Sequence, residues 1–304
     1  MADFQLTDPA KINEIVERRR PSNHAPLPAD LAERLGATHY AGKYHLSDEP
    51  FLLEGVGQLH GFGFKTVKLW LAPQLPGYVY NSKWDLPKDA PLVDVVKHAY
   101  FRQALEAPFE TFIFEIGPVG REPRPRAGKA LKADDFQADA EQFEELALHL
   151  LQTYGGQNLT FILQHWEGDW MLRQKAGEKW NKDNLPADAP ARVETFAAWL
   201  AARQAGVERA RQRAGKTTAR VLHATEANRV LDSLVGVPTI AKDVLPLVAV
   251  DLVSWSCYDG THSKQPAVDT WQGLEILRHY ARPSPAGVKN HVYIGEIGIP
   301  ENEH

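Results

Sequence analysis

Two glutamates occupy segments in which a charged residue is unusual. Glu167 lies in FILQHWEGDW (161–170), directly after an apolar run, and Glu296 lies inside HVYIGEIGIPE (291–301). A carboxylate in such a setting costs free energy unless it has a partner, because burial disfavours an unpaired charge. Two neighbouring carboxyl groups with different surroundings acquire different pKa values, so that one can act as an acid while the other is ionised. Whether Glu167 and Glu296 meet depends on the elements that carry them.

The pattern of short apolar segments separated by helical patterns predicts a parallel β-sheet covered by helices. We expect strands at 38–44, 65–71, 110–117, 159–165, 219–225, 248–256 and 291–298, and helices at 49–60, 92–105, 138–154, 191–213 and 267–281. Seven strand–helix units favour an α/β fold of the (β/α)8 TIM-barrel type. The alternative is a doubly wound open sheet, which usually has a G-x-G-x-x-G turn after its first strand, and this sequence lacks that turn.

We expect a single barrel domain over residues 1–304, with residues 1–36 as an N-terminal helical extension. An eighth strand is missing from the prediction, since six residues follow Gly298. Long segments rich in Pro, Gly or polar residues follow the predicted strand ends at 72–91, 118–137, 168–190 and 257–266. Barrel active sites are built from the loops at the carboxyl ends of the strands. The loop lengths therefore support the barrel.

In a barrel, Glu167 would follow the fourth strand and Glu296 would lie on the seventh, and both would point into one bowl. Retaining glycoside hydrolysis requires two such carboxyl groups, roughly 5–5.5 Å apart. One protonates the leaving oxygen and later activates water, and the other attacks the anomeric carbon. The residues thus predict glycoside hydrolysis with Glu167 and Glu296 as the reacting pair.

The chain resembles the large clan of (β/α)8 retaining glycoside hydrolases that includes cellulases, mannanases and β-galactosidases. The motifs that carry the resemblance are GFKTVKLWL (63–71), HWEGDW (165–170) and GEIGIPE (295–301), and they follow the clan's order over nearly the whole chain. The resemblance implies that Glu167 is the acid/base and Glu296 the nucleophile. It also implies an oligo- or polysaccharide substrate, a role in carbohydrate metabolism or polysaccharide degradation, and no cofactor or metal.

Three departures from the clan pattern indicate a divergent member. Trp166 stands where the clan has an Asn that holds the sugar 2-hydroxyl, and Lys68 stands where the clan has an Arg that steadies the nucleophile. Lys keeps the positive charge but not the bidentate fork of Arg. The third departure is the absence of a predicted eighth strand.

Further polar and aromatic residues near the strand ends are candidates for substrate binding. They are Lys68, Trp70, His165, Trp166, Trp170, His223, Glu226, Asn228, Trp255 and Tyr258. Glu226, in VLHATEANRV, is a rival for the acid/base role or orients another residue of the site. Tyr258 could donate its phenol hydrogen to Glu296, and Trp255 could stack on a sugar ring. For each aromatic residue, packing at the top of the barrel is the alternative. Glu115 is expected to line the bowl.

Composition excludes several classes of protein. The chain of 304 residues has a net charge of −5, which argues against binding to nucleic acid or to a membrane surface. No apolar stretch approaches the length of a membrane span. Cys257 is the only cysteine, which rules out an intrachain disulfide. The start, MADFQLTDP, lacks the apolar core of a signal peptide. We therefore expect a cytoplasmic protein, or a secreted or periplasmic one if a signal has been removed.

Two other functions are open at this stage. The first is a sugar isomerase or epimerase that uses Mn²⁺ or Mg²⁺, for which Glu115, Glu167, Glu226, Glu296 and His223 are the candidate ligands. The second is a non-catalytic carbohydrate-binding barrel, suggested by Trp166 and Lys68 at the departing positions. The sequence does not indicate the sugar, the linkage or the oligomeric state.

Overall fold

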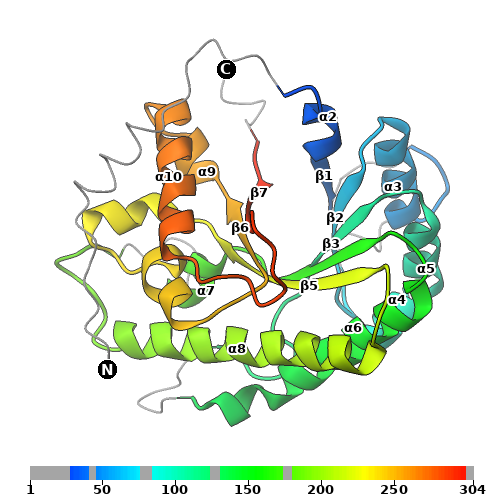
Figure 1. Cartoon of the computed structure of the whole chain (residues 1–304), viewed down its shortest axis with the longest axis horizontal. Helices are drawn as coiled ribbons and strands as arrows, with labels where there is room; N and C mark the ends of the chain where they lie inside the picture. Colours follow the sequence, from blue (N-terminus) through cyan, green and yellow to red (C-terminus); the bar gives the residue numbers. More distant parts are fainter. Residues whose placement is uncertain (1–27, 41–45, 76–83, 124–130, 174–179, 299–304) are drawn as a thin grey trace.

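Seven parallel strands form one nearly closed barrel in the computed structural model, which describes residues 28–40, 46–75, 84–123, 131–173 and 180–298 (Figure 1). The strands are β1 (Gly36–His39), β2 (Thr66–Trp70), β3 (Thr111–Glu115), β4 (Thr160–Gln164), β5 (Arg220–Ala227), β6 (Leu252–Ser256) and β7 (Val292–Glu296). Each strand pairs with the next one along the chain. This sequential order defines a (β/α)8-like TIM barrel with one strand fewer than eight in the described part of the chain, and it excludes the doubly wound sheet, whose strand order reverses.

Helices connect the strands and pack around the outside of the barrel (Figure 1). The helices at the predicted positions are α3 (Phe51–Gly61), α4 (Leu92–Lys97), α5 (Ala99–Glu106), α6 (Gln137–Tyr154), α8 (Ala189–Ala214) and α10 (Pro266–Tyr280). The predicted helix at 92–105 is two helices, because His98 adopts an extended backbone conformation. Its side chain accepts a hydrogen bond from the backbone N–H of Tyr100 and so caps α5.

Shorter helical segments lie outside the predicted strands and helices. They are α7 (Gly168–Arg173), α9 (Tyr258–Thr261) and the non-α helical turns η1 (Ala133–Phe136), η2 (Val230–Val235), η3 (Ile240–Val244) and η4 (Leu245–Leu247). The short helix α2 (Leu31–Arg34) lies within the predicted N-terminal helical extension. Both α7 and α9 directly follow strand ends. The segments after β4 and β6 are therefore more regular than the sequence pattern indicated.

The two faces of the sheet have different partners. Residues that pair in register across parallel strands point to the same side. The outward residues, packed beneath the helices, include Val67, Phe112, Phe161 and Val221. The inward residues, at the centre of the barrel, include Ile113, Ile162, Leu222, Ala224 and Leu252. The apolar inner layer fills the middle of the barrel. Lys68 is in register with Ile113 of this layer, and its side chain reaches Glu115 at the carboxyl end of β3.

The seam between β1 and β7 is where the barrel is incomplete. No pairing joins these two strands within the described part of the chain. β1 begins at Gly36, before the predicted strand start at residue 38. The predicted N-terminal extension of residues 1–36 therefore overlaps β1 at its last residue. Residues 1–27 and 41–45, which hold the rest of the predicted extension and strand, lie outside the described residues. None of the helices within the described ranges is both long and apolar enough to span a membrane.

Candidate active site

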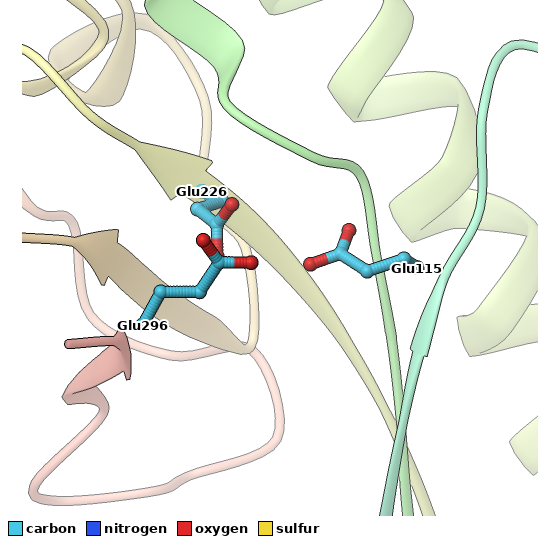
Figure 2. A group of neighbouring side chains, drawn as sticks. All are labelled: Glu115, Glu226 and Glu296. Atoms are coloured by element: carbon cyan, nitrogen blue, oxygen red, sulfur yellow. The ribbon is translucent and has the colours of Figure 1, made fainter. Parts of the chain in front are cut away.

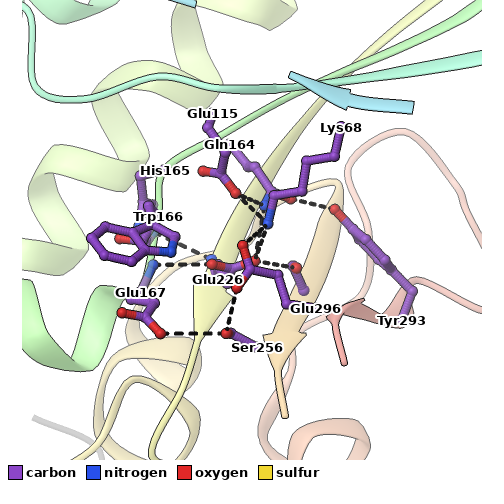
Figure 3. Close-up of polar contacts among 11 residues, drawn as sticks. Lys68, Glu115, Gln164, His165, Trp166, Glu167, Glu226, Ser256, Tyr293 and Glu296 are labelled. Carbon is purple, nitrogen blue, oxygen red and sulfur yellow. Dashed lines mark hydrogen bonds and ion pairs between the residues drawn. The ribbon is translucent and has the colours of Figure 1, made fainter. Parts of the chain in front are cut away.

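Lys68 is the centre of a buried polar network above the apolar inner layer (Figure 3). Its Nζ atom lies 2.5 Å from Glu115 Oε1, 3.0 Å from Glu226 Oε2 and 2.8 Å from Glu296 Oε1. An ammonium group has three hydrogens, so three carboxylates account for all of them. The nearby carboxylates outweigh the effect of burial and raise the pKa of Lys68, which therefore stays cationic. Lys68 organises carboxylates and has no hydrogen left to donate to a substrate.

Gln164 connects three of the strands that surround Lys68. Its Nε2 atom donates to Glu115 Oε1 at 2.6 Å and to Glu226 Oε2 at 2.9 Å. Tyr293, on β7, donates its hydroxyl hydrogen to Gln164 Oε1. Gln164 is two residues beyond Ile162 on β4 and therefore faces the same interior. The amide fixes the two glutamates relative to each other.

Glu226 is fully buried and accepts hydrogen bonds from several sides. Besides Lys68 and Gln164, Ser254 donates its hydroxyl to Oε2 at 3.0 Å, and the backbone N–H of Glu167 donates to Oε1 at 3.0 Å. Both carboxylate oxygens are thus engaged with protein groups. Glu226 is consequently suited to orient its neighbours, and less suited than Glu167 to exchange a proton with a substrate.

Glu167 lies at the mouth of the barrel, half-buried. It is the only non-glycine residue in the described ranges with a positive φ, at 38°. Such a backbone conformation costs of order 1–3 kcal/mol and persists only where surrounding contacts hold it, as the Glu226 hydrogen bond does here. Burial, followed by the negative charges of Glu296 and Glu226, raises the pKa of Glu167 to about 7. A carboxyl group in this state can donate a proton near neutral pH.

Ser256 joins Glu167 to Glu296 (Figure 3). Its Oγ atom lies 3.1 Å from Glu296 Oε2 and 3.4 Å from Glu167 Oε1. The two carboxylate oxygens are therefore separated by at most the sum of these distances. The two carboxyl groups are thus close neighbours at the mouth of the barrel, as glycoside hydrolysis by a pair of carboxyl groups requires. The side chain of Glu296 is 12% exposed, so it is open at the bowl while Lys68 holds it from below.

A bulge in β7 brings Glu296 to the inside of the barrel. Ser254 pairs with Tyr293 and Ser256 pairs with Glu296, although one residue lies between these pairs on β6 and two lie between them on β7. The extra residue allows Tyr293 and Glu296 both to point inward. It falls beside Gly295, where a Cβ atom would lie 1.9 Å from Ser254 Oγ and 2.9 Å from Glu226 Oε2. Glycine at this position leaves the space that the network fills.

Three carboxylates converge closely enough to be candidate ligands of a metal ion. Glu115, Glu226 and Glu296 each offer an oxygen, and these oxygens lie within 4.8 Å of one another (Figure 2). Lys68 Nζ contacts all three groups and so occupies the position between them that a cation would take. A divalent ion at this point would have to displace a buried ammonium group. The geometry therefore favours Lys68 as the resident cation.

A cavity of about 360 Å³ opens beside Glu167. Its lining comes from α7, from the segment after β5 and from α9, and consists of Glu167, Trp170, Asn228, Arg229, Leu231, Asp232, Tyr258, Asp259 and His262. Trp170, Asn228 and Tyr258 were predicted to contact substrate, and the structure brings them together around this cavity. Both aspartates of the wall are already paired: Asp232 with Arg173 and Arg229, and Asp259 with Trp255 Nε1 and the Leu231 N–H.

Three predicted substrate-binding residues point away from the bowl, and the prediction is wrong for each. His165 is buried against Phe196 and Trp199 of α8, and desolvation lowers its pKa to about 3. His223 is buried too, and Gln204 of α8 contacts its Nδ1 at 3.2 Å. Trp255 is fully buried beneath α10, where Gly273 leaves room for its ring. Side chains point alternately to the two faces of a strand, and all three residues are at positions that point outward.

The remaining predicted residues lie at or near the bowl. Trp166 is 50% exposed beside Glu167. Trp70 is half-buried, and its ring packs against Tyr40 at a centroid distance of 4.3 Å with the ring planes tilted by 31°. Tyr258 lines the cavity, but the hydrogen bonds to the Glu296 carboxylate come from Lys68 and Ser256, so the predicted Tyr258 bond is not formed. Cys257 is a buried core residue, as expected, and burial raises its pKa to about 12.

Sequence reasoning missed Gln164, Ser254, Ser256 and Tyr293, and it did not foresee the pairing of Glu115 with Lys68. Strand periodicity could have found the first three. Once Glu226 is placed inward on β5, Ser254 and Ser256 are the residues of β6 that share its side, as Gln164 does on β4. Tyr293 could not be found in this way. The bulge interrupts the alternation of side chains on β7, so Tyr293 and Glu296 both point inward although they are three positions apart.

No protein-family model matches this chain, and no curated protein matches it. The fold and the geometry of the site define a TIM barrel with two facing glutamates at its mouth. The expected relationship to retaining glycoside hydrolases remains a prediction.

Proposed function

We propose that this protein is a retaining glycoside hydrolase that acts on oligo- or polysaccharides. The observation that carries the proposal is the Ser256 bridge, which holds Glu167 and Glu296 near each other at the carboxyl ends of β4 and β7. Retaining hydrolysis needs two carboxyl groups at close range with different roles. The environments of Glu167 and Glu296 differ in the required sense, since only Glu296 contacts the Lys68 ammonium.

Glu167 is proposed as the acid/base. Its raised pKa of about 7 keeps a proton available for the leaving oxygen at neutral pH. It lines the cavity directly, whereas Glu226, the rival for this role, is buried beneath it with both oxygens engaged. Glu226 is assigned instead to hold the strained backbone of Glu167 in place.

Glu296 is proposed as the nucleophile. Lys68 Nζ and Ser256 Oγ each hold one of its oxygens, at 2.8 and 3.1 Å, which fixes the carboxylate in one orientation. Attack by one oxygen on the anomeric carbon would form a glycosyl ester, and water activated by Glu167 would then release the sugar. Lys68 thus serves the steadying role that an Arg has in the clan that the sequence resembles.

The cavity beside Glu167 is proposed to hold the leaving group. The general acid must lie next to the departing oxygen, and the nucleophile must lie next to the carbon under attack. Glu167 lines this cavity and Glu296 does not, so the cavity is on the leaving-group side of the pair. Trp170 and Tyr258 supply aromatic surface there, as sugar-binding pockets commonly do.

The proposal is tested with 2-deoxy-2-fluoro glycosides that carry good leaving groups, offered as a panel of common pyranoses. We expect one of them to inactivate the enzyme and to leave a single adduct on the peptide containing Glu296, detected by mass spectrometry. Glu296→Gln should prevent labelling while the far-ultraviolet circular dichroism spectrum stays unchanged. Hydrolysis with inversion, or turnover near the wild-type rate in Glu296→Gln, would overturn the proposal. Sugar binding without turnover by any panel member would indicate a carbohydrate-binding barrel instead.

A metal-dependent isomerase is the second candidate, because Glu115, Glu226 and Glu296 converge. It requires Mn²⁺ or Mg²⁺ to replace Lys68 at the centre of the cluster. Titration calorimetry with each ion distinguishes the two candidates. Stoichiometric binding that is lost in Glu115→Gln would favour the isomerase, and the absence of binding would favour the hydrolase.

A further inference from the structure

The cluster around Lys68 has more negative than positive groups. Glu115 and Glu226 are buried, Glu296 is 12% exposed, and all three contact the single Lys68 ammonium. If all three glutamates were ionised, two negative charges would be uncompensated. Burial of unpaired charge is costly enough that such groups bind protons instead. The geometry thus calls for a proton on one of the three carboxyl groups.

The hydrogen-bond donors are unevenly distributed among the three. Glu226 accepts from Lys68, Gln164, Ser254 and the Glu167 N–H. Glu296 receives one donor on each oxygen, from Lys68 and from Ser256. Donated hydrogen bonds of this kind stabilise the ionised form of a carboxyl group.

Glu115 differs from both. Lys68 and Gln164 both contact its Oε1 atom, while Oε2 is buried and has no hydrogen-bond partner. A carboxylate oxygen without a donor is far costlier to bury than the oxygen of a neutral acid. Glu115 is therefore the member of the cluster that the structure leaves least able to carry a charge.

We propose that Glu115 is a neutral carboxylic acid at neutral pH and acts as a positioning residue, holding Lys68 so that its charge is shared between Glu226 and Glu296. This rests on the proposed function, in which Glu296 is the nucleophile. The acidic and basic groups that face Glu115 are Lys68 from β2, Glu226 from β5, and Tyr293 and Glu296 from β7. Gln164 from β4 faces it as a neutral donor.

The electrostatic surroundings agree with this assignment. Burial is the main cause that raises the pKa of Glu115, the charge of Glu226 adds to it, and Lys68 opposes it, so that the pKa reaches about 8. The assignment also balances charge along the reaction. When Glu296 forms an ester it loses its charge, and Lys68 is then matched by Glu226 alone. A neutral Glu115 therefore leaves a buried cluster without net charge in the covalent intermediate.

The test is a pH titration of glutamate side chains by ¹³C NMR with ¹³Cδ-labelled glutamate. No substrate is required. We expect one buried carboxyl to titrate near pH 8, and its signal to be absent from Glu115→Gln but present in Glu167→Gln. The second variant is needed because Glu167 also titrates late, near pH 7. Retention of the signal in Glu115→Gln, or its loss in Glu226→Gln with Glu115 ionised throughout, would overturn the assignment.

A kinetic readout separates positioning from a purely structural role. Gln has the shape of a neutral Glu, so Glu115→Gln should keep wild-type kcat and KM at pH 6, while Glu115→Ala should lower kcat. Glu226→Gln, the matched variant, should lose activity at every pH because its charge is needed. If Glu115→Gln and Glu226→Gln lost activity equally, Glu115 would not be neutral. If the NMR result held and no glycoside were cleaved, the proposed function would fail while the protonation state stood.

Discussion

Lys68 Nζ lies 2.8 Å from Glu296 Oε1, although 228 positions of the chain separate the two residues. The contact crosses the barrel interior from β2 to β7, and the same ammonium group reaches Glu115 on β3 and Glu226 on β5. A single side chain thus ties four strands together at the level of the bowl. Stability and the orientation of the proposed nucleophile depend on the same cation.

Removal of that cation should destabilise the fold in a pH-dependent way. Lys68→Met leaves three carboxyl groups without their partner, and breaking a buried ion pair typically costs about 3–5 kcal/mol. We expect a loss of that size at pH 8 and a smaller loss at pH 5, where the glutamates can take up protons. Urea unfolding at both pH values measures it.

Lys65→Met is the control for that experiment, because Lys65 is exposed immediately before β2. An exposed substitution of this kind typically changes the stability by less than about 0.5 kcal/mol. An equal loss for Lys68→Met at pH 5 and pH 8 would contradict the electrostatic role of Lys68.

Turnover should depend on the protonation of Glu167. Its raised pKa of about 7 predicts that kcat falls as pH rises through 7, because the proton for the leaving group is lost. Glu167→Gln should lower kcat by about 10²–10⁴-fold with poor leaving groups and remove this alkaline limb. The pH–rate profile of the variant checks both. Glu110→Gln, at the opposite end of the barrel, should behave as wild type, and a limb that survived in Glu167→Gln would assign the acid elsewhere.

Ser256 should affect the pKa of Glu167. Ser256 has a single hydroxyl hydrogen, which can turn from Glu296 to Glu167 when Glu167 ionises. That hydrogen bond lowers the pKa of Glu167, so Ser256→Ala should raise the pKa and move the alkaline limb of the profile to higher pH. Loss of the bond to Glu296 should also reduce kcat by an amount equivalent to about 0.5–1.5 kcal/mol. Ser254→Ala is the matched variant, since Ser254 contacts Glu226 but neither reacting group. A limb that shifted in Ser254→Ala and stayed in place in Ser256→Ala would refute the bridging role.

Gly295 should not tolerate a side chain. A Cβ atom there would meet Ser254 Oγ at 1.9 Å, so Gly295→Ala must displace the network, and overpacking of this kind costs about 1–3 kcal/mol. Gly298→Ala is the natural comparison, because its Cβ would lie 3.6 Å from the Tyr258 ring, an ordinary contact. Thermal unfolding should separate the two variants. Equal midpoints would show that β7 relaxes freely around Gly295.

The strands and the main helices could be predicted from the sequence, because apolar periodicity reports burial locally. Strand ends at β2 to β4 and β7 agree with the predicted segments to within a few residues. The placement of Glu167 and Glu296 at the carboxyl ends of strands also followed from local pattern. The predictions for His165, His223 and Trp255 were wrong because every polar or aromatic residue near a strand end was taken to point inward. The alternation of side chains along a strand places these three residues on the outer face.

The sequence by itself determined the barrel architecture and the two candidate carboxyl groups, since both depend on patterns a few residues long. Only the tertiary structure decided that Lys68 meets three glutamates and that Ser256 bridges Glu167 and Glu296. The physical reason is that these contacts join strands far apart in the chain. Their geometry depends on the register of the whole sheet and on one bulge beside Gly295, and neither is encoded in the pattern of any single strand.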